Sequence, residues 1–588
     1  MDMRFLLLTS ILMAGIQASA QKYDYLWRHG SYSQFYPDFR DFVVDFHTFP
    51  PAIIPLGMDT TIFLQGSGIT MCNKEGKVVF FSNGCSLFTA DDHVMEDGEV
   101  LNPGKIFDVY CKKQGYYPIY QGMFAIHLKH NLYRVFHQRQ DDKGLSGRCT
   151  YPDILYSTVD MDQNGGQGKV IESNVELFHG CPQVLCANRH ANGRDWWLLL
   201  ASNESDAYYR YLLTPDTILG PWIQQIENPA RDTSEYYGWS DFSQDGQKFV
   251  NTHFRAGIAV YDFDRCTGLL SNLRYVPRAS NTVDFRFASI FSPNGRFLYS
   301  SVGYPARVDQ FDLTAPDLVA SRKTVEVWDG TKDEFGHNIL FHFFQHGPDG
   351  KIYIWSFSRY IHVIDYPDRA GLACHVGQRA IKLPSPAFDA NFYYPHYRLG
   401  PLDGSSCDTL GINNLPHAEY RYDLSDSTQA WALQFTDVSW YEPDHWHWDF
   451  NDPASGGSNT SLEQNPVHTF SQSGTYTVCL IASNQYAADT ICKEVKVGIS
   501  SSYALPALPQ AQVYPNPVTD ALMVSLPALL PGHQLYFTLT DALGRTVRKI
   551  TLSDFETELN MADLPKGIYF WKIRSGWDIL QTGKVVKM

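Results

Sequence analysis

The sequence has no excess of basic residues, and this absence argues against polyanionic partners. Lys and Arg number 47 against 63 Asp and Glu, which gives a formal net charge of −16. Non-specific binding to nucleic acid depends on basic side chains that neutralise phosphates. We therefore expect no nucleic-acid partner.

Long apolar runs are also missing, except at the N-terminus. Arg4 precedes the apolar run Phe5–Ile16, and the small residues Ala18–Ala20 follow it. This pattern is typical of a secretory signal peptide over residues 1–20, with Gln21 as the first mature residue. No cysteine follows the cleavage position, which disfavours a lipoprotein. No later stretch approaches the roughly 18 apolar residues that a membrane span needs, so none is expected.

No CxxC pair occurs, so a cysteine-based zinc site is not expected. The 11 cysteines fit an oxidising compartment, and their odd number leaves at least one unpaired. Cys479 and Cys492 flank a strand–turn–strand pattern, which places them at nearly opposite positions of two paired strands. We predict a disulfide between these two residues. The pairing of the others stays open.

Familiar catalytic signatures are absent as well. The chain contains no GxSxG, HExxH, phosphate-binding loop or dinucleotide-binding fingerprint. We therefore assign no catalytic residues, and the sequence favours a protein that is not an enzyme.

Six similar segments are present in the first two thirds of the chain. Each has a turn with Gly or Asn, then a polar residue, then a run of aromatic and β-branched residues, which is typical of a tight hairpin. The six segments are Asn73–Phe81, Leu128–Phe136, Arg189–Leu200, Ser243–Val250, Ser292–Ser301 and Gly347–Trp355. Their turns lie 49 to 62 residues apart. This interval is close to one four-stranded blade of a β-propeller, for which repeats of about 40–50 residues are usual.

The segment SPNGRFLYSS, Ser292–Ser301, resembles the blade motif of lactonase-like and surface-layer propellers. Met71–Gly104 is similar to the first blade of propeller-like exported proteins of Bacteroidetes. The sequence thus predicts an all-β chain with a β-propeller of six or seven blades, seven favoured, over residues 21–402. A seventh blade is expected to combine Phe388–Leu399 with an N-terminal strand such as Phe39–Phe46.

The pattern changes after the propeller. Trp448, Asp449 and Phe450, and further on the segment Gly474–Val478, resemble the motifs of a PKD domain, an immunoglobulin-like β-sandwich. Alternating apolar residues on both strands fit two packed sheets. We predict this sandwich over residues 415–498, followed by a linker over residues 499–510.

The last segment begins with VYPNPVTD, Val513–Asp520, and ends with GKVVKM, Gly583–Met588. With Leu539–Ile550 and Leu564–Ile573 between them, these motifs resemble the type A C-terminal sorting domain of the type IX secretion system. The resemblance implies a small β-sandwich over residues 511–588 that the secretion machinery recognises. It also implies passage through the periplasm to the outer-membrane surface or the medium.

Candidate binding residues are His and Arg side chains that fall near the predicted blade strands. If the innermost strands carry them, these residues line the central channel and bind an anionic group. They are His253, Arg255, Arg286, His346, His396 and Arg398. For each residue alone, a framework role is the favoured interpretation.

Asp160, Asp162 and Asn164 occupy alternate positions before Gly165, as at the start of a calcium loop. The twelfth position, which needs Glu in an EF-hand, is Ile171. A glycine-rich turn is therefore favoured, and any calcium bound there would be structural. We expect no other cofactor. His445, His447 and Asp449 share one face of a strand and could hold zinc, but a structural role is favoured.

Three functions remain open. The leading hypothesis is a secreted or surface binding protein, with a propeller that binds a carbohydrate or protein ligand and a PKD-like spacer. The second is a secreted propeller hydrolase or lyase that acts on polysaccharide or lactone. The third is a structural component of a surface layer or a gliding apparatus.

Overall fold

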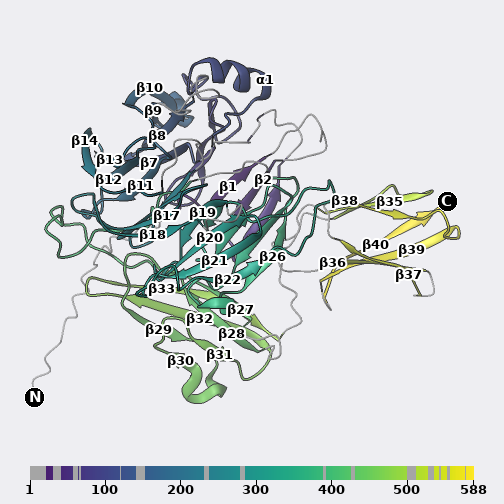
Figure 1. Ribbon diagram of the computed structural model, residues 1–588. Helices are drawn as coiled ribbons and strands as arrows, with labels where there is room; N and C mark the ends of the chain where they lie inside the picture. Colours follow the sequence, from purple (N-terminus) through teal and green to yellow (C-terminus); the bar gives the residue numbers. More distant parts are fainter. Residues whose placement is uncertain are drawn as a thin grey trace, which may run out of the picture.

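The computed structural model is all-β, as the sequence predicts (Figure 1). Residues 1–20, and with them the predicted signal peptide, lie outside the described part. The structure describes residues 21–30, 41–56, 62, 64, 68–119, 121–140, 153–230, 238–278, 285–387, 393–424, 431–498, 511–526, 535–541, 545–552, 556–575 and 578–588.

Helical structure within the described residues is short. It comprises a π-helical turn (Phe107–Cys111), α1 (Lys112–Gln114) and the 3₁₀ turns Asn164–Gly166, Gly371–Cys374 and Pro453–Asn459. No helix among the described residues is long and apolar enough to cross a membrane.

Seven antiparallel sheets follow one another between Leu26 and Lys382, and we call them together the sheet body. Within each sheet the strands pair in the order of the sequence. The first two sheets are β1 (Leu26–His29), β2 (Phe42–Asp45), β3 (Ala52–Pro55) and β4 (Ile69–Cys72), β5 (Val78–Ser82), β6 (Leu87–Thr89). The third and fourth are β7 (Met123–Lys129), β8 (Leu132–Arg139), β9 (Asp153–Asp160), β10 (Lys169–His179) and β11 (Cys186–Arg189), β12 (Trp196–Ala201), β13 (Ala207–Leu213), β14 (Ile218–Gln225). The fifth, sixth and seventh are β15 (Gly238–Phe242), β16 (Lys248–His253), β17 (Gly257–Asp264), β18 (Leu269–Pro277); β19 (Arg286–Phe291), β20 (Phe297–Gly303), β21 (Ala306–Asp312), β22 (Lys323–Val327); and β23 (Phe344–His346), β24 (Ile352–Trp355), β25 (Tyr360–Ile364), β26 (Val376–Lys382).

All six predicted turns join the first and second strands of a sheet. They connect β4 to β5, β7 to β8, β11 to β12, β15 to β16, β19 to β20 and β23 to β24. Gly246 and Gly350 adopt φ values of 69° and 74°. A residue with a side chain would be strained in this backbone conformation. Because one tip occurs in each of the second to seventh sheets, the six tips lie at equivalent positions.

Neighbouring sheets touch through their first strands. β1 contacts β4, β4 contacts β7, β11 contacts β15, β15 contacts β19, and β19 contacts β23. The first sheet also packs against the last, because the Trp27 ring lies 5.4 Å from Tyr353 and His29 lies 4.3 Å from Trp355, centroid to centroid. These rings form part of one continuous buried core.

Residues 393–399, which we call the central segment, run between the first strands of several sheets. Tyr397 Oη donates to a carbonyl of β7 at 2.6 Å, and Tyr393 Oη donates to a carbonyl of β11 at 3.0 Å. His396 Nε2 lies 2.7 Å from a carbonyl of β15, and the Tyr394 ring stacks on Trp27 of β1. The segment therefore fills space among sheets that are far apart in sequence.

One sequence prediction about this region is wrong for the described residues. Phe42–Asp45 is β2 and pairs with β1 and β3, whereas residues 393–399 form no strand and join no ladder. The tyrosine side chains, not backbone pairing, hold the central segment against the sheets. Residues 388–392 lie outside the described part.

A second unit, the middle module, consists of two sheets that share a core of aromatic rings. The sheets are β27 (Tyr420–Leu424), β28 (Ala432–Asp437), β31 (Val467–Thr469) and β30 (Thr460–Ser461), β29 (His445–Asp449), β32 (Gly474–Ser483), β33 (Ala488–Val497). Trp448 and Phe450 are fully buried between them, as their alternation predicts. Asp449 Oδ1 accepts the Asn451 N–H at 2.9 Å, so this carboxylate stabilises the turn.

Three disulfides occur among the described residues, and one was predicted. Cys479 and Cys492 are direct partners of β32 and β33, and their sulfurs are bonded. The other two are Cys85–Cys111 and Cys266–Cys407. Cys72, Cys186 and Cys374 are free and buried.

The Cys479–Cys492 disulfide is expected to stabilise the middle module. Replacing both residues with serine should lower its free energy of unfolding by about 3 kcal/mol, because a short loop in the unfolded chain is no longer closed. Urea unfolding of the full chain measures this loss. The exposed neighbour Thr477→Ser is the matched control, and an unchanged urea midpoint in the double variant would contradict the prediction.

The C-terminal module projects away from the rest of the molecule (Figure 1). Its sheets are β34 (Gln512–Tyr514), β35 (Ala521–Ser525), β38 (Glu556–Asn560) and β37 (Thr546–Leu552), β36 (Leu535–Thr540), β39 (Gly567–Ser575), β40 (Asp578–Lys587). Tyr569 and Trp571 are buried while Ile568 and Phe570 are exposed, so one face of β39 packs in the core.

The opening motif of this module pairs with its last strand. Asn516 Oδ1 accepts the Val586 N–H at 3.0 Å, and Asn516 Nδ2 donates to the Lys584 carbonyl at 3.0 Å. The Val518 N–H donates to the Val586 carbonyl at 2.8 Å. The two ends of the predicted sorting segment therefore fold together.

The middle module packs on the last sheet of the sheet body. Arg421 of β27 is buried, and its guanidinium donates to the carbonyls of Asp349 and Asp365 at 2.8 and 2.9 Å. Lys351 bridges Asp365 and Asp423 at 2.8 and 3.1 Å. Cys266–Cys407 attaches the connecting segment to the sheet body. This docking creates the walls of the site described next.

Candidate functional site

A groove of about 690 Å³ lies between the sheet body and the middle module. From the sheet body it is lined by the tips of the fifth, sixth and seventh sheets and by the central segment. From the middle module it is lined by residues 434–442 in part and by Gln464 and Asn465. The lining is about half polar, with Tyr366, Tyr394, Trp440 and Tyr441 as aromatic members.

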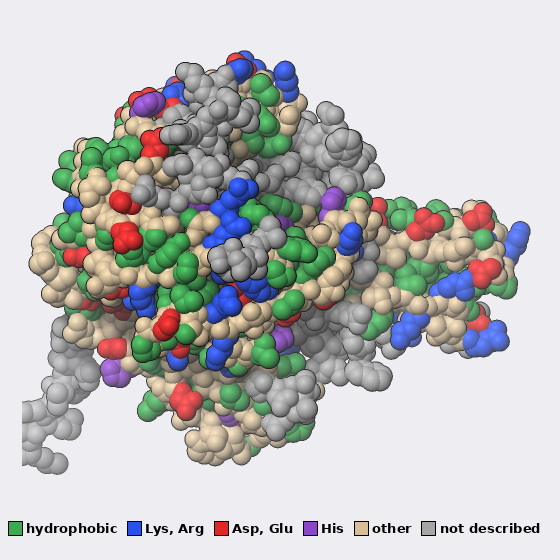
Figure 2. Space-filling model, viewed as in Figure 1, with side chains coloured by type: hydrophobic (Ala, Val, Ile, Leu, Met, Phe, Trp, Pro, Cys, Tyr) green, Lys and Arg blue, Asp and Glu red, His purple; other side chains and the backbone are tan. Residues whose placement is uncertain are grey.

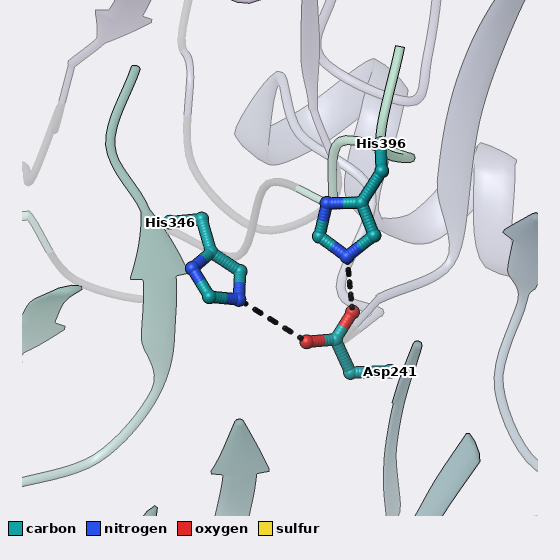
Figure 3. A group of neighbouring side chains, drawn as sticks. All are labelled: Asp241, His346 and His396. Atoms are coloured by element: carbon teal, nitrogen blue, oxygen red, sulfur yellow. Dashed lines mark ion pairs between the residues drawn. The ribbon is translucent and has the colours of Figure 1, made fainter. Parts of the chain in front are cut away.

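Asp241, His346 and His396 form a cluster beside this groove. Asp241 belongs to β15, His346 is the last residue of β23, and His396 lies in the central segment. Figure 3 shows the carboxylate between the two rings, with His346 Nε2 at 3.8 Å from Oδ2 and His396 Nε2 at 3.9 Å from Oδ1. Among the described residues, this is the one group of three His, Cys, Asp or Glu side chains whose ligand atoms lie so close together.

Asp241 is buried and the two histidines are 13% exposed, and the polar atoms of the cluster are incompletely paired. Burial raises the pKa of Asp241 well above its usual range. Burial also lowers the pKa of both His346 and His396. Within the described residues, Asp241 Oδ2 and His346 Nε2 have no hydrogen-bond partner. Two polar atoms therefore face each other across a gap too wide for a hydrogen bond.

Three of the predicted binding residues meet at this groove. His346, His396 and Arg398 all line it. Arg398 pairs with Asp24, and its guanidinium lies over the Trp440 ring at 5.0 Å. The arrangement brings together residues from the seventh sheet and the central segment that are about fifty positions apart in sequence.

The other three predicted residues lie at the opposite ends of the strands. His253 ends β16 and pairs with the first residue of β15, and Arg286 begins β19. The buried Arg286 donates to Ser300 Oγ at 3.2 Å, and Arg255 lies over the Phe285 ring at 5.7 Å. The six candidates therefore form two groups and not one.

Asp241 was missed by the sequence analysis. It lies in β15, where Trp239 and Phe242 are buried with it. A carboxylate in such an apolar strand could have indicated a functional residue. Burying a charged group is costly, so such groups are rarely buried without a partner.

The candidate calcium loop folds as a turn between β9 and β10. Asp160 Oδ1 accepts the Asp162 N–H at 3.0 Å, and Asp162 Oδ1 accepts an N–H of Asn131 at 2.6 Å. Asn164 and Gly165 have φ values of 50° and 64°. Asp160 and Asp162 thus take part in the hydrogen bonds of the hairpin, and calcium binding at this turn stays a prediction.

The described surface carries charges of both signs. Figure 2 shows acidic and basic side chains interspersed over one face, with apolar side chains between them.

Family comparison assigns the two smaller modules. Residues 413–499 match the PKD domain family, and residues 512–588 match the family described as the secretion system C-terminal sorting domain. The chain carries a PKD domain and a type IX sorting domain. The sorting domain directs export to the cell surface or the medium, which implies interaction with the secretion machinery. The PKD domain is the module whose docking on the sheet body forms the groove.

Comparison with solved structures gives distant similarities. A protein from Lactobacillus plantarum is 14% identical, with a TM-score of 0.38, and the match covers 62% of this chain and 97% of that one. A putative 6-phosphogluconolactonase from Bacteroides uniformis is 13% identical, with a TM-score of 0.32 and coverage of 71% and 93%. PorZ, a surface component of the type IX secretion system of Porphyromonas gingivalis, is 10% identical, with a TM-score of 0.31 and coverage of 94% and 73%. A search of curated proteins found no match.

Proposed function

We propose that the chain is an exported binding protein whose groove holds a carbohydrate or protein ligand, with carbohydrate the better fit. The observation that carries this proposal is the groove of about 690 Å³ with walls from two domains. Ligand sites commonly enclose roughly 300–1,000 Å³ and carry a few convergent polar groups.

The polar groups at the groove suit sugar hydroxyls. Arg369 is exposed, stacks over the Tyr366 ring at 4.1 Å and donates to Gln434 Oε1 at 2.8 Å. Exposed Asp245 and Gln464 add a carboxylate and an amide to the lining. Guanidinium, carboxylate and amide groups provide both donors and acceptors, which vicinal hydroxyls require. The PKD domain then takes part in binding and is more than a spacer.

The sheet body is proposed to be a seven-bladed β-propeller over residues 21–402. Contacts between successive first strands, the packing of β1 on the last sheet and the central segment support this arrangement. In such a ring each blade keeps only a short, protected outer edge. The PKD domain would span residues 415–498, and residues 511–588 the sorting domain, with a linker at 499–510.

The test is a glycan array probed with the mature chain, followed by calorimetry with the best ligand. Arg369→Ala and Gln464→Ala should each weaken binding by about tenfold, equivalent to about 1.4 kcal/mol. Glu463→Ala is the matched control, since Glu463 adjoins Gln464 but does not line the groove. Saturable binding that both groove variants leave unchanged would refute the groove as the site, and an array without hits would refute the carbohydrate.

A hydrolase or lyase is the second candidate, and the observation in its favour is the Asp241 cluster beside the groove. Against it, the tyrosines of the central segment occupy the space among the first strands. Turnover of a lactone or polysaccharide that Asp241→Asn abolishes would establish this candidate. Self-assembly of the purified chain without ligand would instead favour a structural component.

A further inference from the structure

We propose that Asp241, His346 and His396 bind one divalent transition-metal ion, with Zn²⁺ the best match. Two imidazole nitrogens and one carboxylate form a ligand set that suits zinc, whereas calcium prefers oxygen ligands alone. The site is distinct from the candidate calcium loop and does not depend on the identity of the groove ligand.

The distances fit an ion with small side-chain movements. Ligand atoms bound to zinc at about 2.0–2.1 Å in a tetrahedron lie roughly 3.4 Å apart. The two nitrogen–oxygen distances in the cluster are 3.8 and 3.9 Å, as drawn in Figure 3. Each of these two distances would contract by about 0.5 Å on binding, and all three ligand atoms already lie within 4.8 Å of one another.

Incomplete hydrogen bonding provides an independent argument. Asp241 is 5% exposed, and its Oδ2 has no hydrogen-bond partner within the described residues, nor has His346 Nε2. Unpaired polar atoms at this depth are costly, so native proteins place a water or an ion between them. The two atoms point at the same gap, and an ion there would pair both.

Two further contacts bear on how the rings would bind an ion. Gln244 Nε2 lies 3.4 Å from His346 Nδ1, and the Gln244 amide would have to turn so that its oxygen accepts the Nδ1–H of a metal-bound ring. His396 Nε2 lies 2.7 Å from the Phe242 carbonyl, so zinc binding would require this ring to lose its Nε2 proton and turn away from the carbonyl. His346 and His396 line the groove, which gives the fourth coordination position access to water or ligand.

The ion would also join three parts of the fold. Asp241 and His346 lie on the first strands of the fifth and seventh sheets, and His396 lies on the central segment. A bound ion therefore fixes the central segment to the sheets and should raise the melting temperature of the chain.

The test uses the tag-free mature chain, freed of metal with a chelator and titrated with ZnCl₂ against a chromogenic competitor. We expect one tight zinc per chain, and a loss of at least about 100-fold in affinity in His346→Ala and Asp241→Asn. Asp241→Asn preserves side-chain shape, so it remains informative even if His346→Ala does not fold. Cobalt substitution should give visible bands of a four- or five-coordinate site without a thiolate charge-transfer band.

His447→Ala is the matched control, because His447 is exposed and belongs to the strand motif that the sequence also offers as a zinc site. The zinc affinity of the His447→Ala variant should equal that of the wild type. No tight zinc in the wild type, wild-type affinity in both cluster variants, or zinc lost from His447→Ala would each overturn the proposal. A thiolate band would assign the metal to a buried cysteine and overturn it equally.

Discussion

Acidification from pH of about 6.5 to about 5 should lower the free energy of unfolding of the sheet body by about 6 kcal/mol. Burial lowers the pKa of His137, His342 and His362 to about 3 each. In the unfolded chain these histidines titrate near 6.5. Below that pH the unfolded state binds protons that the folded state does not.

Acidification therefore favours the unfolded state. The contribution of the three histidines to stability is fully present above pH of about 6.5 and is lost as the pH falls toward 3, at about 1.4 kcal/mol per pH unit for each. Because domains are stable by only about 5–15 kcal/mol, the loss is a large fraction of the total.

Urea unfolding, followed by tryptophan fluorescence at several pH values, measures the effect. His137→Gln should reduce the pH slope by about 1.4 kcal/mol per unit, since one buried titrating group is removed. His93→Gln is the matched control, because the His93 side chain is 80% exposed. A urea midpoint that stays constant down to pH 5 would show that these histidines are protonated in the folded state.

Arg421→Ala should separate the PKD domain from the sheet body at a cost of about 3 kcal/mol in docking free energy. The substitution removes the donors to the carbonyls of Asp349 and Asp365 and leaves Asp423 without its arginine. Buried acceptors without donors are costly, and the Lys351 ion pair alone cannot satisfy them. The groove between the two domains should open as a result.

Small-angle scattering should show a larger radius of gyration for Arg421→Ala, and protease should cut the connecting segment faster. Arg421→Lys should behave in the same direction, because an ammonium cannot reproduce the geometry of the guanidinium. Arg545→Ala, at an exposed pair in the sorting domain, is the control. If scattering and proteolysis of Arg421→Ala match those of the wild type, Arg421 does not hold the domains together.

Local patterns made much of this architecture predictable. Turn residues such as Gly246 and Gly350 act through their own backbone geometry, so the six hairpins could be predicted from sequence. The Cys479–Cys492 pair was predictable for the same reason, because both residues belong to one hairpin. The PKD and sorting domains also have short motifs with fixed spacing.

The candidate site was only half predictable. His346, His396 and Arg398 were identified as candidates, but so were His253, Arg255 and Arg286, which lie at the opposite ends of the strands. Which end of a strand faces a groove depends on the docking of another domain, and no local pattern encodes that. Asp241 escaped notice because its partners are about one hundred and more positions away.

The sequence by itself determined that this protein is exported, that its fold is all-β and where its hairpins lie. Each of these features depends on residues that are close together in the chain. Only the tertiary structure decided that the central segment packs through tyrosine side chains, that the PKD domain docks through Arg421 and that a carboxylate lies between two histidines. These features depend on contacts between residues distant in sequence, and such contacts are fixed by the packing of the whole fold.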